Sequence, residues 1–100
     1  MRRTIEDAAW STLIRERAGY SCEKCGKWYG PKHSGLHAAH IFGRGNKSVR
    51  WDPENGVALC MRDHLYWAHS NPIEFAEWIK ERLGPEKYES LRIRARTLKV

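Results

Sequence analysis

Three cysteines and two nearby polar residues have the types and spacing of a metal-binding site. Cys22 and Cys25 are separated by two residues, so both thiolates can bind one ion from a single turn of the chain. Cys60 is the obvious third ligand, and Asp63 or His64 would supply the fourth. Histidine is the commoner ligand of structural zinc, whereas Asp63 repeats the two-residue spacing of the first pair. The pattern favours a structural Zn²⁺ site over a redox pair or two buried thiols.

The cysteine count and the apolar content indicate the cellular compartment of the protein. Three cysteines are an odd number, whereas a secreted disulfide framework usually has an even one. No apolar run follows Met1-Arg2-Arg3, and no stretch approaches the roughly 20 apolar residues of a membrane span. We therefore expect a cytoplasmic protein without a membrane segment, whose thiolates bind metal rather than form disulfides.

The chain is short and basic. One hundred residues argue for one domain over 1–100, with a limited core that the binding energy of a structural metal would help to stabilise. Lys and Arg number 18 and Asp and Glu 12, which gives a formal net charge of +6. Such a surface favours a polyanionic partner, and phosphate contacts would make binding salt-dependent. The charge alone is equally typical of a merely soluble basic protein.

Local signals place helices towards both ends of the chain. Thr4 can cap a first helix that Gly19 ends, while Asn71-Pro72 and Pro85 are typical starts of two later helices. The expected helices cover about residues 4–18, 71–83 and 85–98. The apolar face of the first helix is expected at Ile5, Ala9 and Leu13, with Ala8 and Ile14 as further candidates.

The centre of the chain is rich in loops and holds two short apolar runs. Residues 36–42 and 57–59 are expected strands, and a helical pattern follows Cys60 to about Ala68. Strands and helices in this order predict a small α+β fold. Three tryptophans are expected to pack in the core rather than stack on bases: Trp51, Trp67 and Trp78.

Four separated pieces occur in an order that resembles the His-Asn-His (HNH) endonucleases, which cut nucleic acid with a ββα-metal fold. The pieces are Cys22-x-x-Cys25, Ala38-Ala39-His40-Ile41, Asn55-Gly56-Val57-Ala58-Leu59-Cys60 and Asp63-His64. Zinc-stapled members read L-C-x-x-C-H where this chain reads Leu59-Cys60-Met61-Arg62-Asp63-His64, and Arg50-Trp51-Asp52-Pro53 is similar to phage-type members. The resemblance covers residues 22–69. It implies a ββα-metal core with a zinc knuckle, and it aligns Asp63 with the last zinc-binding cysteine.

The resemblance also implies a role for each polar residue of the motif. His40 would be the general base that takes a proton from the attacking water. Asn55 would fix the hairpin loop or hold the imidazole of His40 through its side-chain carbonyl. His64 would bind the catalytic divalent cation. If His64 completes the zinc site instead, His69 becomes the leading catalytic ligand.

One position departs from the family pattern. Many members carry an aspartate or histidine directly before the base, where it helps to hold the catalytic metal, and this chain has Ala39. The cation would then have few protein ligands and more water and phosphate oxygens, which suits Mg²⁺ or Mn²⁺. The gap leaves room for His37 or His69 to assist. On an α-helix, His69 would lie one residue off the face of His64.

The sequence as a whole predicts a metal-dependent HNH endonuclease that hydrolyses DNA phosphodiester bonds. By resemblance it would leave 5′-phosphate and 3′-hydroxyl ends, and one small active site should nick a single strand unless the protein dimerises. Arg44, Lys47 and Arg50 lie between the expected strands and are candidates for phosphate contacts. The alternative is a non-catalytic, zinc-stapled nucleic-acid-binding module, which would explain the charge and cysteines but not the His-Asn-His order.

Overall fold

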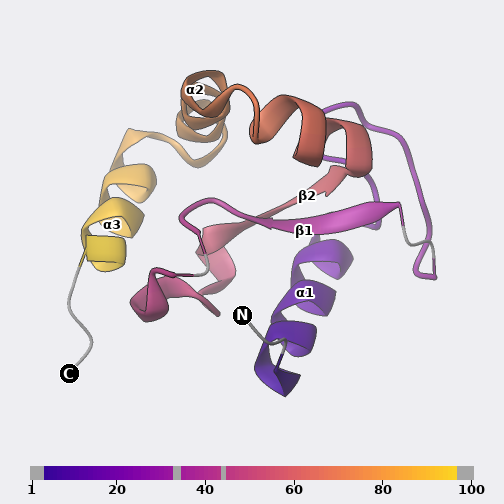
Figure 1. The fold of residues 1–100 in the computed structure, drawn as a ribbon, viewed down its shortest axis with the longest axis horizontal. Helices are drawn as coiled ribbons and strands as arrows, with labels where there is room; N and C mark the ends of the chain where they lie inside the picture. The colour runs from indigo at the N-terminus through magenta and orange to yellow at the C-terminus, as the bar shows by residue number, and fades with distance from the viewer. Residues whose placement is uncertain (1–3, 33–34, 44, 97–100) are drawn as a thin grey trace.

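A computed structural model describes residues 4–32, 35–43 and 45–96 and places a two-stranded sheet among helices (Figure 1). The elements are α1 (Ile5–Arg17), β1 (Leu36–His40), β2 (Gly56–Cys60), a π-helix η3 (Arg62–Ala68), α2 (Pro72–Leu83) and α3 (Pro85–Arg96), with short 3-10 turns η1 (Lys47–Val49) and η2 (Pro53–Asn55) in the loop between the strands. In Figure 1, α1 lies on one side of the sheet, and η3 and α2 lie on the other. The α+β expectation is confirmed.

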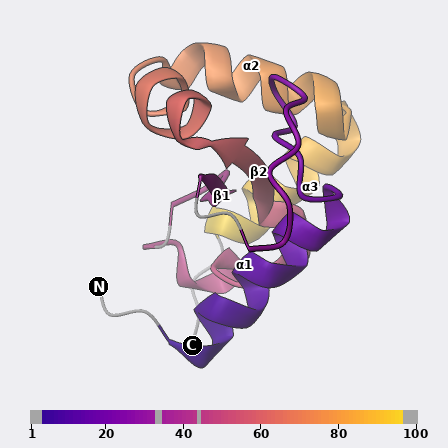
Figure 2. The same cartoon turned by 90° about the vertical axis from the view of Figure 1, so that its right-hand side faces the viewer.

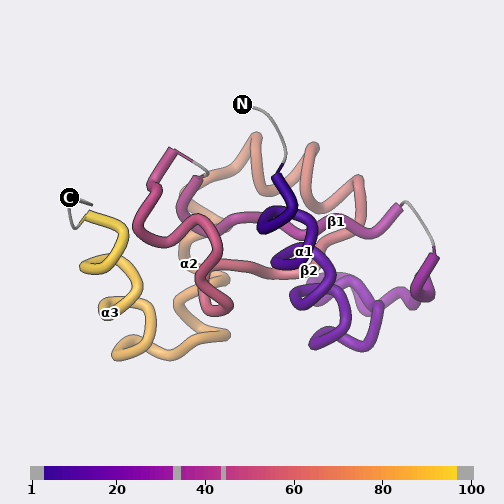
Figure 3. Tube along the Cα trace, turned by 90° about the horizontal axis from the view of Figure 1, so that it is seen from below, coloured from indigo at the N-terminus to yellow at the C-terminus, as the bar shows by residue number. Residues whose placement is uncertain are grey.

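The sheet is a single antiparallel pair whose register fixes the neighbours of the candidate residues. Leu36 pairs with Cys60 and His40 with Gly56. All five residues of β2 are buried, because α1 packs on one face of the sheet and η3 and α2 on the other. Figure 3 shows α1 lying across both strands. β1 ends at His40, two residues earlier than expected, because Phe42 is already bonded to a side chain rather than to β2.

Helix α1 begins as predicted but turns a different face to the sheet. Thr4 caps it in a reciprocal capping box with Asp7. The buried positions are Asp7, Trp10 and Ile14, whereas Ile5 is 86% exposed. Leu13 and Ala9 are exposed as well, so the predicted apolar face was wrong at these three positions, whereas Ile14, a further candidate for it, is fully buried. Counting apolar residues could not reveal that the buried face includes a carboxylate whose partner lies far along the chain.

Helix α2 and the described part of α3 begin and end close to the expected bounds. Pro72 stands at the first turn of α2 and Gly84, with φ of 87°, follows its last residue. The expected last residues of α3, 97–98, lie outside the described part of the chain. None of the helices in the described ranges is long and apolar enough to cross a membrane.

The helix after β2 is wound more loosely than an α-helix. The amide of His69 donates to the carbonyl oxygen of His64 at 3.2 Å, which is an i to i+5 bond. This winding brings residues five apart closer together than an α-helix would, and the imidazole centroids of His64 and His69 are 4.7 Å apart. The expectation that His69 lies off the face of His64 was wrong, because it assumed the 3.6-residue period of an α-helix.

Aromatic side chains from η3 and α2 pack on the side of the sheet opposite α1. Trp67 meets Phe75 and Trp78 edge to face, with centroids 5.9 and 5.6 Å apart, and all three border the core. Trp51 is different, because it is 39% exposed and its indole nitrogen donates to Asp7. Trp67 and Trp78 thus pack as predicted, whereas Trp51 lies at the surface.

A candidate metal cluster and a histidine-lined pocket

Three thiols and one carboxylate converge at one end of the sheet. One ligand atom from each of Cys22, Cys25, Cys60 and Asp63 lies within 4.8 Å of the others. Asp63 Oδ2 is 3.3 Å from the Sγ atoms of Cys22 and Cys60, and the Sγ atoms of Cys25 and Cys60 are 3.9 Å apart. Sulfur atoms bound tetrahedrally at about 2.3 Å from zinc are about 3.8 Å apart. The donor set fits a structural metal ion such as zinc.

The chain builds this cluster from three segments. The knuckle closes when Cys22 N donates to Lys27 O at 2.9 Å and Gly26, at φ of 82°, donates to Cys22 O at 2.8 Å. Cys60 ends β2, and Asp63 lies in the first turn of η3. The segment after α1 runs past the sheet towards α2 (Figure 2), so an ion bound here would join the knuckle, the sheet and η3.

A salt-bridged glutamate anchors the knuckle to the sheet. The backbone N–H of Glu23 donates to Ala58 O at 2.8 Å, and its carboxylate accepts from Ala58 N at 2.7 Å. Arg82 of α2 donates to the other carboxylate oxygen at 2.5 Å. Glu23 therefore sets the position of the two knuckle cysteines relative to β2.

The protonation of the cluster follows from its burial. Burial raises the pKa of the Cys22 thiol to about 12. For Cys25, which is exposed, a backbone hydrogen bond at Lys27 lowers the pKa. Burial opposes ionisation of Asp63, but hydrogen bonds from the thiols still hold its pKa below the ordinary value. A cation would displace the thiol protons, so its binding would weaken as the pH falls.

Asp63 and His64, the two candidates for the fourth metal ligand, lie at different sites. Within residues 4–32, 35–43 and 45–96, the cluster of Cys22, Cys25, Cys60 and Asp63 is the one group of three or more potential ligands that converge. His64 instead lines a pocket of about 380 Å³. The structure thus places Asp63, the residue aligned by the family resemblance, beside the thiols.

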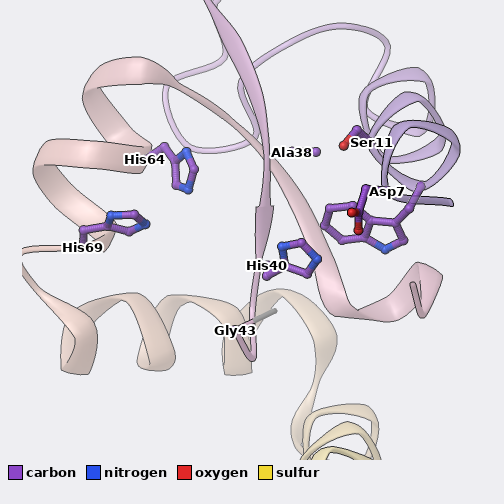
Figure 4. Close-up of a pocket in the computed structure, with 8 residues that line it drawn as sticks. Asp7, Ser11, Ala38, His40, Gly43, His64 and His69 are labelled. Atoms are coloured by element: carbon purple, nitrogen blue, oxygen red, sulfur yellow. The ribbon is translucent and has the colours of Figure 1, made fainter. Parts of the chain in front are cut away.

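The pocket spans the edge of β1. Figure 4 shows His64 and His69 on one side of the strand, Asp7 and Ser11 on the other, and His40 beside the strand. Its lining residues are Asp7, Trp10, Ser11, Ala38, His40, Gly43, His64 and His69. Two of the three motif residues, His40 and His64, therefore meet at one cavity.

Arg50 and Trp10 help to hold His40 in one orientation. Its Nε2 lies 3.0 Å from the backbone carbonyl oxygen of Arg50, and because a carbonyl only accepts, this nitrogen carries the proton. In the neutral ring the lone pair is then on Nδ1. The imidazole also stacks on Trp10, with centroids 4.0 Å apart and planes 9° apart. Trp10 is itself fixed by a 2.8 Å bond to Asp52 O.

Arg50 is a structural residue in this fold. It is buried, and its Nε and Nη2 donate to the two carboxylate oxygens of Asp7 at 2.9 and 2.5 Å. Trp51 Nε1 donates to Asp7 as well, at 2.9 Å. The pairing with Arg50 holds the pKa of Asp7 well below its ordinary value. The sequence suggested Arg50 as a phosphate contact and did not indicate its pairing with Asp7, because nothing local links residues 43 positions apart.

Asn55 fixes the loop between the strands. It is fully buried, and its Oδ1 accepts from Phe42 N at 2.8 Å. Its Nδ2 donates to the carbonyl oxygens of Phe42 and Val49 at 2.9 and 3.0 Å. These bonds correspond to the first of its two expected roles. Of the basic loop candidates, Lys47 is exposed in η1 and Arg44 lies outside the described residues.

Three histidines lie close together at the pocket: His64 and His69 line it, and His37 contacts His64. The Nδ1 atoms of His37 and His64 are 3.0 Å apart, and the rings of His64 and His69 meet edge to face. Burial lowers the pKa of His64 to about 4, helped by the neighbouring histidines. Burial and then the charge of Arg15 lower the pKa of His37. Near pH 7 both imidazoles are neutral and can offer a lone pair.

No protein family, curated protein or solved structure was found to match this chain. The fold and the cluster define a small α+β protein whose Cys₃Asp group is compatible with a zinc-binding module.

Proposed function

We propose that this chain is a metal-dependent HNH endonuclease that hydrolyses DNA phosphodiester bonds. The observation that carries the proposal is the pairing of His40 and His64 across one pocket. His40 comes from the first strand and His64 from the helix that follows the second, as in the resemblance. A cavity at a strand edge between them suits an extended phosphodiester backbone.

His40 has the bonding that a general base needs. With Nε2–H held by Arg50 O, the proton of an attacking water can be taken up only at Nδ1. The carbonyl then stabilises the imidazolium that forms, because its bond to Nε2–H strengthens as the ring becomes positive. The Trp10 face stacked on the ring keeps the imidazole from rotating during the transfer.

His64 is the residue proposed to hold the divalent cation on the opposite side of the phosphate. Such a cation, when bound, would stabilise charge on the phosphorane and on the departing oxygen. The net charge of +6 supports DNA as the partner, and Lys47, which is exposed in η1, is proposed to contact phosphate.

The test is nicking of supercoiled plasmid by the zinc-loaded protein with added Mg²⁺ or Mn²⁺. We expect conversion to open circles that DNA ligase reseals directly, since ligase needs a 5′-phosphate and a 3′-hydroxyl. His40→Ala should abolish nicking while keeping the metal content and thermal unfolding of the wild type. Undiminished nicking by purified His40→Ala would refute the assignment. Binding of plasmid without cleavage under any divalent ion would favour the non-catalytic module.

A further inference from the structure

Two histidines outside the cysteine cluster have the spacing of a metal-binding pair. The Nδ1 atoms of His37 and His64 lie 3.0 Å apart. Two nitrogens bound to one ion at about 2.1 Å are about 3.0 Å apart at a right angle and about 3.4 Å apart in a tetrahedron. The same distance that permits a hydrogen bond between the rings therefore also permits a shared ion.

The strand places His37 on the face where the missing ligand of the family pattern would have been. Side chains alternate along β1, so His37 lies on the same face as Ala39 and on the opposite face from His40. Ala39 is buried and offers only a methyl group. His37, one pleat earlier, reaches His64 instead.

We propose that His37 and His64 form a two-nitrogen site for a transition-metal ion such as Co²⁺, Ni²⁺, Zn²⁺ or Mn²⁺. Paired imidazoles suit these ions, whereas Mg²⁺ prefers oxygen ligands and retains its water. The catalytic part of this inference rests on the proposed nuclease function, and it makes a transition metal, rather than Mg²⁺, the cation of that site. The binding part depends only on the two rings.

His69 provides an internal comparison. Its ring packs edge to face on His64 at a centroid distance of 4.7 Å, one π-helical turn further on. It lines the pocket beside His64 and packs ring against ring on it, whereas the Nδ1 atoms of His37 and His64 are 3.0 Å apart. Removing His69 therefore takes an imidazole from the pocket without removing a proposed ligand.

The direct test is a titration of the zinc-loaded full chain with Co²⁺. Calorimetry and visible absorption measure how much Co²⁺ binds and which atoms bind it. Wild type should bind one Co²⁺ beyond the zinc, without the sulfur-to-cobalt charge-transfer band that exchange into the cysteine cluster would produce. A parallel Mg²⁺ titration should show binding weaker by at least about a hundredfold. His37→Ala and His64→Ala should each weaken Co²⁺ binding at least about tenfold, whereas His69→Ala should change it less than about threefold.

Several outcomes would overturn the site: no second ion bound by wild type, unchanged Co²⁺ affinity in His37→Ala, or equal weakening by His69→Ala and His37→Ala. His40→Ala separates this inference from the nuclease proposal, since it should lose nicking and keep the second Co²⁺. A wild type that binds the second Co²⁺ through His37 and His64 but never nicks would refute the nuclease alone. A nicking enzyme whose preference among metals survives His37→Ala would refute the site alone.

Discussion

The backbone carbonyl oxygen of Arg50 lies 3.0 Å from Nε2 of His40 and decides which imidazole nitrogen carries the proton. The side chain of the same arginine is bound by both carboxylate oxygens of Asp7 in α1. Arg50 thus acts on His40 through its backbone, and its charge is used to hold that backbone in place. An N-terminal helix outside the HNH-like segment thereby takes part in orienting the proposed base.

Neutralising Asp7 should change how stability depends on pH. Its pKa is lowered in the fold by Arg50, so between that pKa and the ordinary value of 3.8 the unfolded chain binds the extra proton. The stabilisation is therefore complete well above pH 3.8 and is lost as the pH falls through the folded pKa. Urea unfolding should show an Asp7→Asn deficit that is largest near pH 7 and shrinks in acid. Glu6→Gln, an exposed neighbour in the same turn, is the control, and an equal deficit there would contradict the prediction.

Truncating Asn55 should destabilise the fold strongly. Asn55→Ala leaves the amide of Phe42 and the carbonyls of Phe42 and Val49 without their partner, at a combined cost of about 3 kcal/mol. Asn46→Ala is the matched control, because its exposed side chain makes one bond within the described part of the chain, to Gly43 O, and should cost less than about 0.5 kcal/mol. Denaturant midpoints measure both, and similar losses would show that Asn55 does not anchor the loop.

Chelation of the metal and substitution of the two candidate residues should show which of them is the fourth ligand of the cysteine cluster. We expect chelation to lower the melting temperature, because three segments of the chain meet at the cluster. Asp63→Ala should weaken zinc binding at least about tenfold, and Asp63→Cys should retain the ion with four thiolates. His64→Ala should keep zinc at wild-type affinity. Zinc lost from His64→Ala but kept by Asp63→Ala would reverse the ligand assignment.

Adding a methyl group at Gly56 should disturb the proposed base indirectly. A Cβ there would lie 2.5 Å from Trp10 Cζ2 and 2.6 Å from Ile14 Cδ1, so the indole that stacks on His40 must shift. We expect Gly56→Ala to cost about 1–3 kcal/mol and to slow nicking beyond its effect on stability. Gly45→Ala, which adds its methyl in open space, should change neither stability nor nicking.

The sequence predicted the elements whose signals are local. Thr4, Pro72 and Gly84 mark helix ends through capping and backbone preferences. The two-residue spacing of Cys22 and Cys25 predicted that their thiols converge, and they do so in the structure. The pattern also brought His40 and His64 to one pocket, through the family resemblance.

What the sequence did not predict depends on contacts between distant residues or on an unusual helical period. The pairing of Asp7 with Arg50 joins residues 43 apart, and it places a carboxylate where an apolar face was expected. The π-helix brings His69 onto the face of His64, and no composition rule distinguishes that winding from an α-helix. The nitrogen-to-nitrogen contact of His37 with His64 likewise appears only once β1 and η3 are packed together.

Asp63 and His64 are consecutive residues that serve different centres, one beside the thiols and one at the pocket. One planar peptide unit joins them, so an ion that holds Asp63 also restrains the backbone from which His64 projects. Uptake of metal by the cluster would then act as a maturation step for the chain. Under the proposed nuclease function, a freshly synthesised copy would begin to cleave DNA only after its first metal ion arrived.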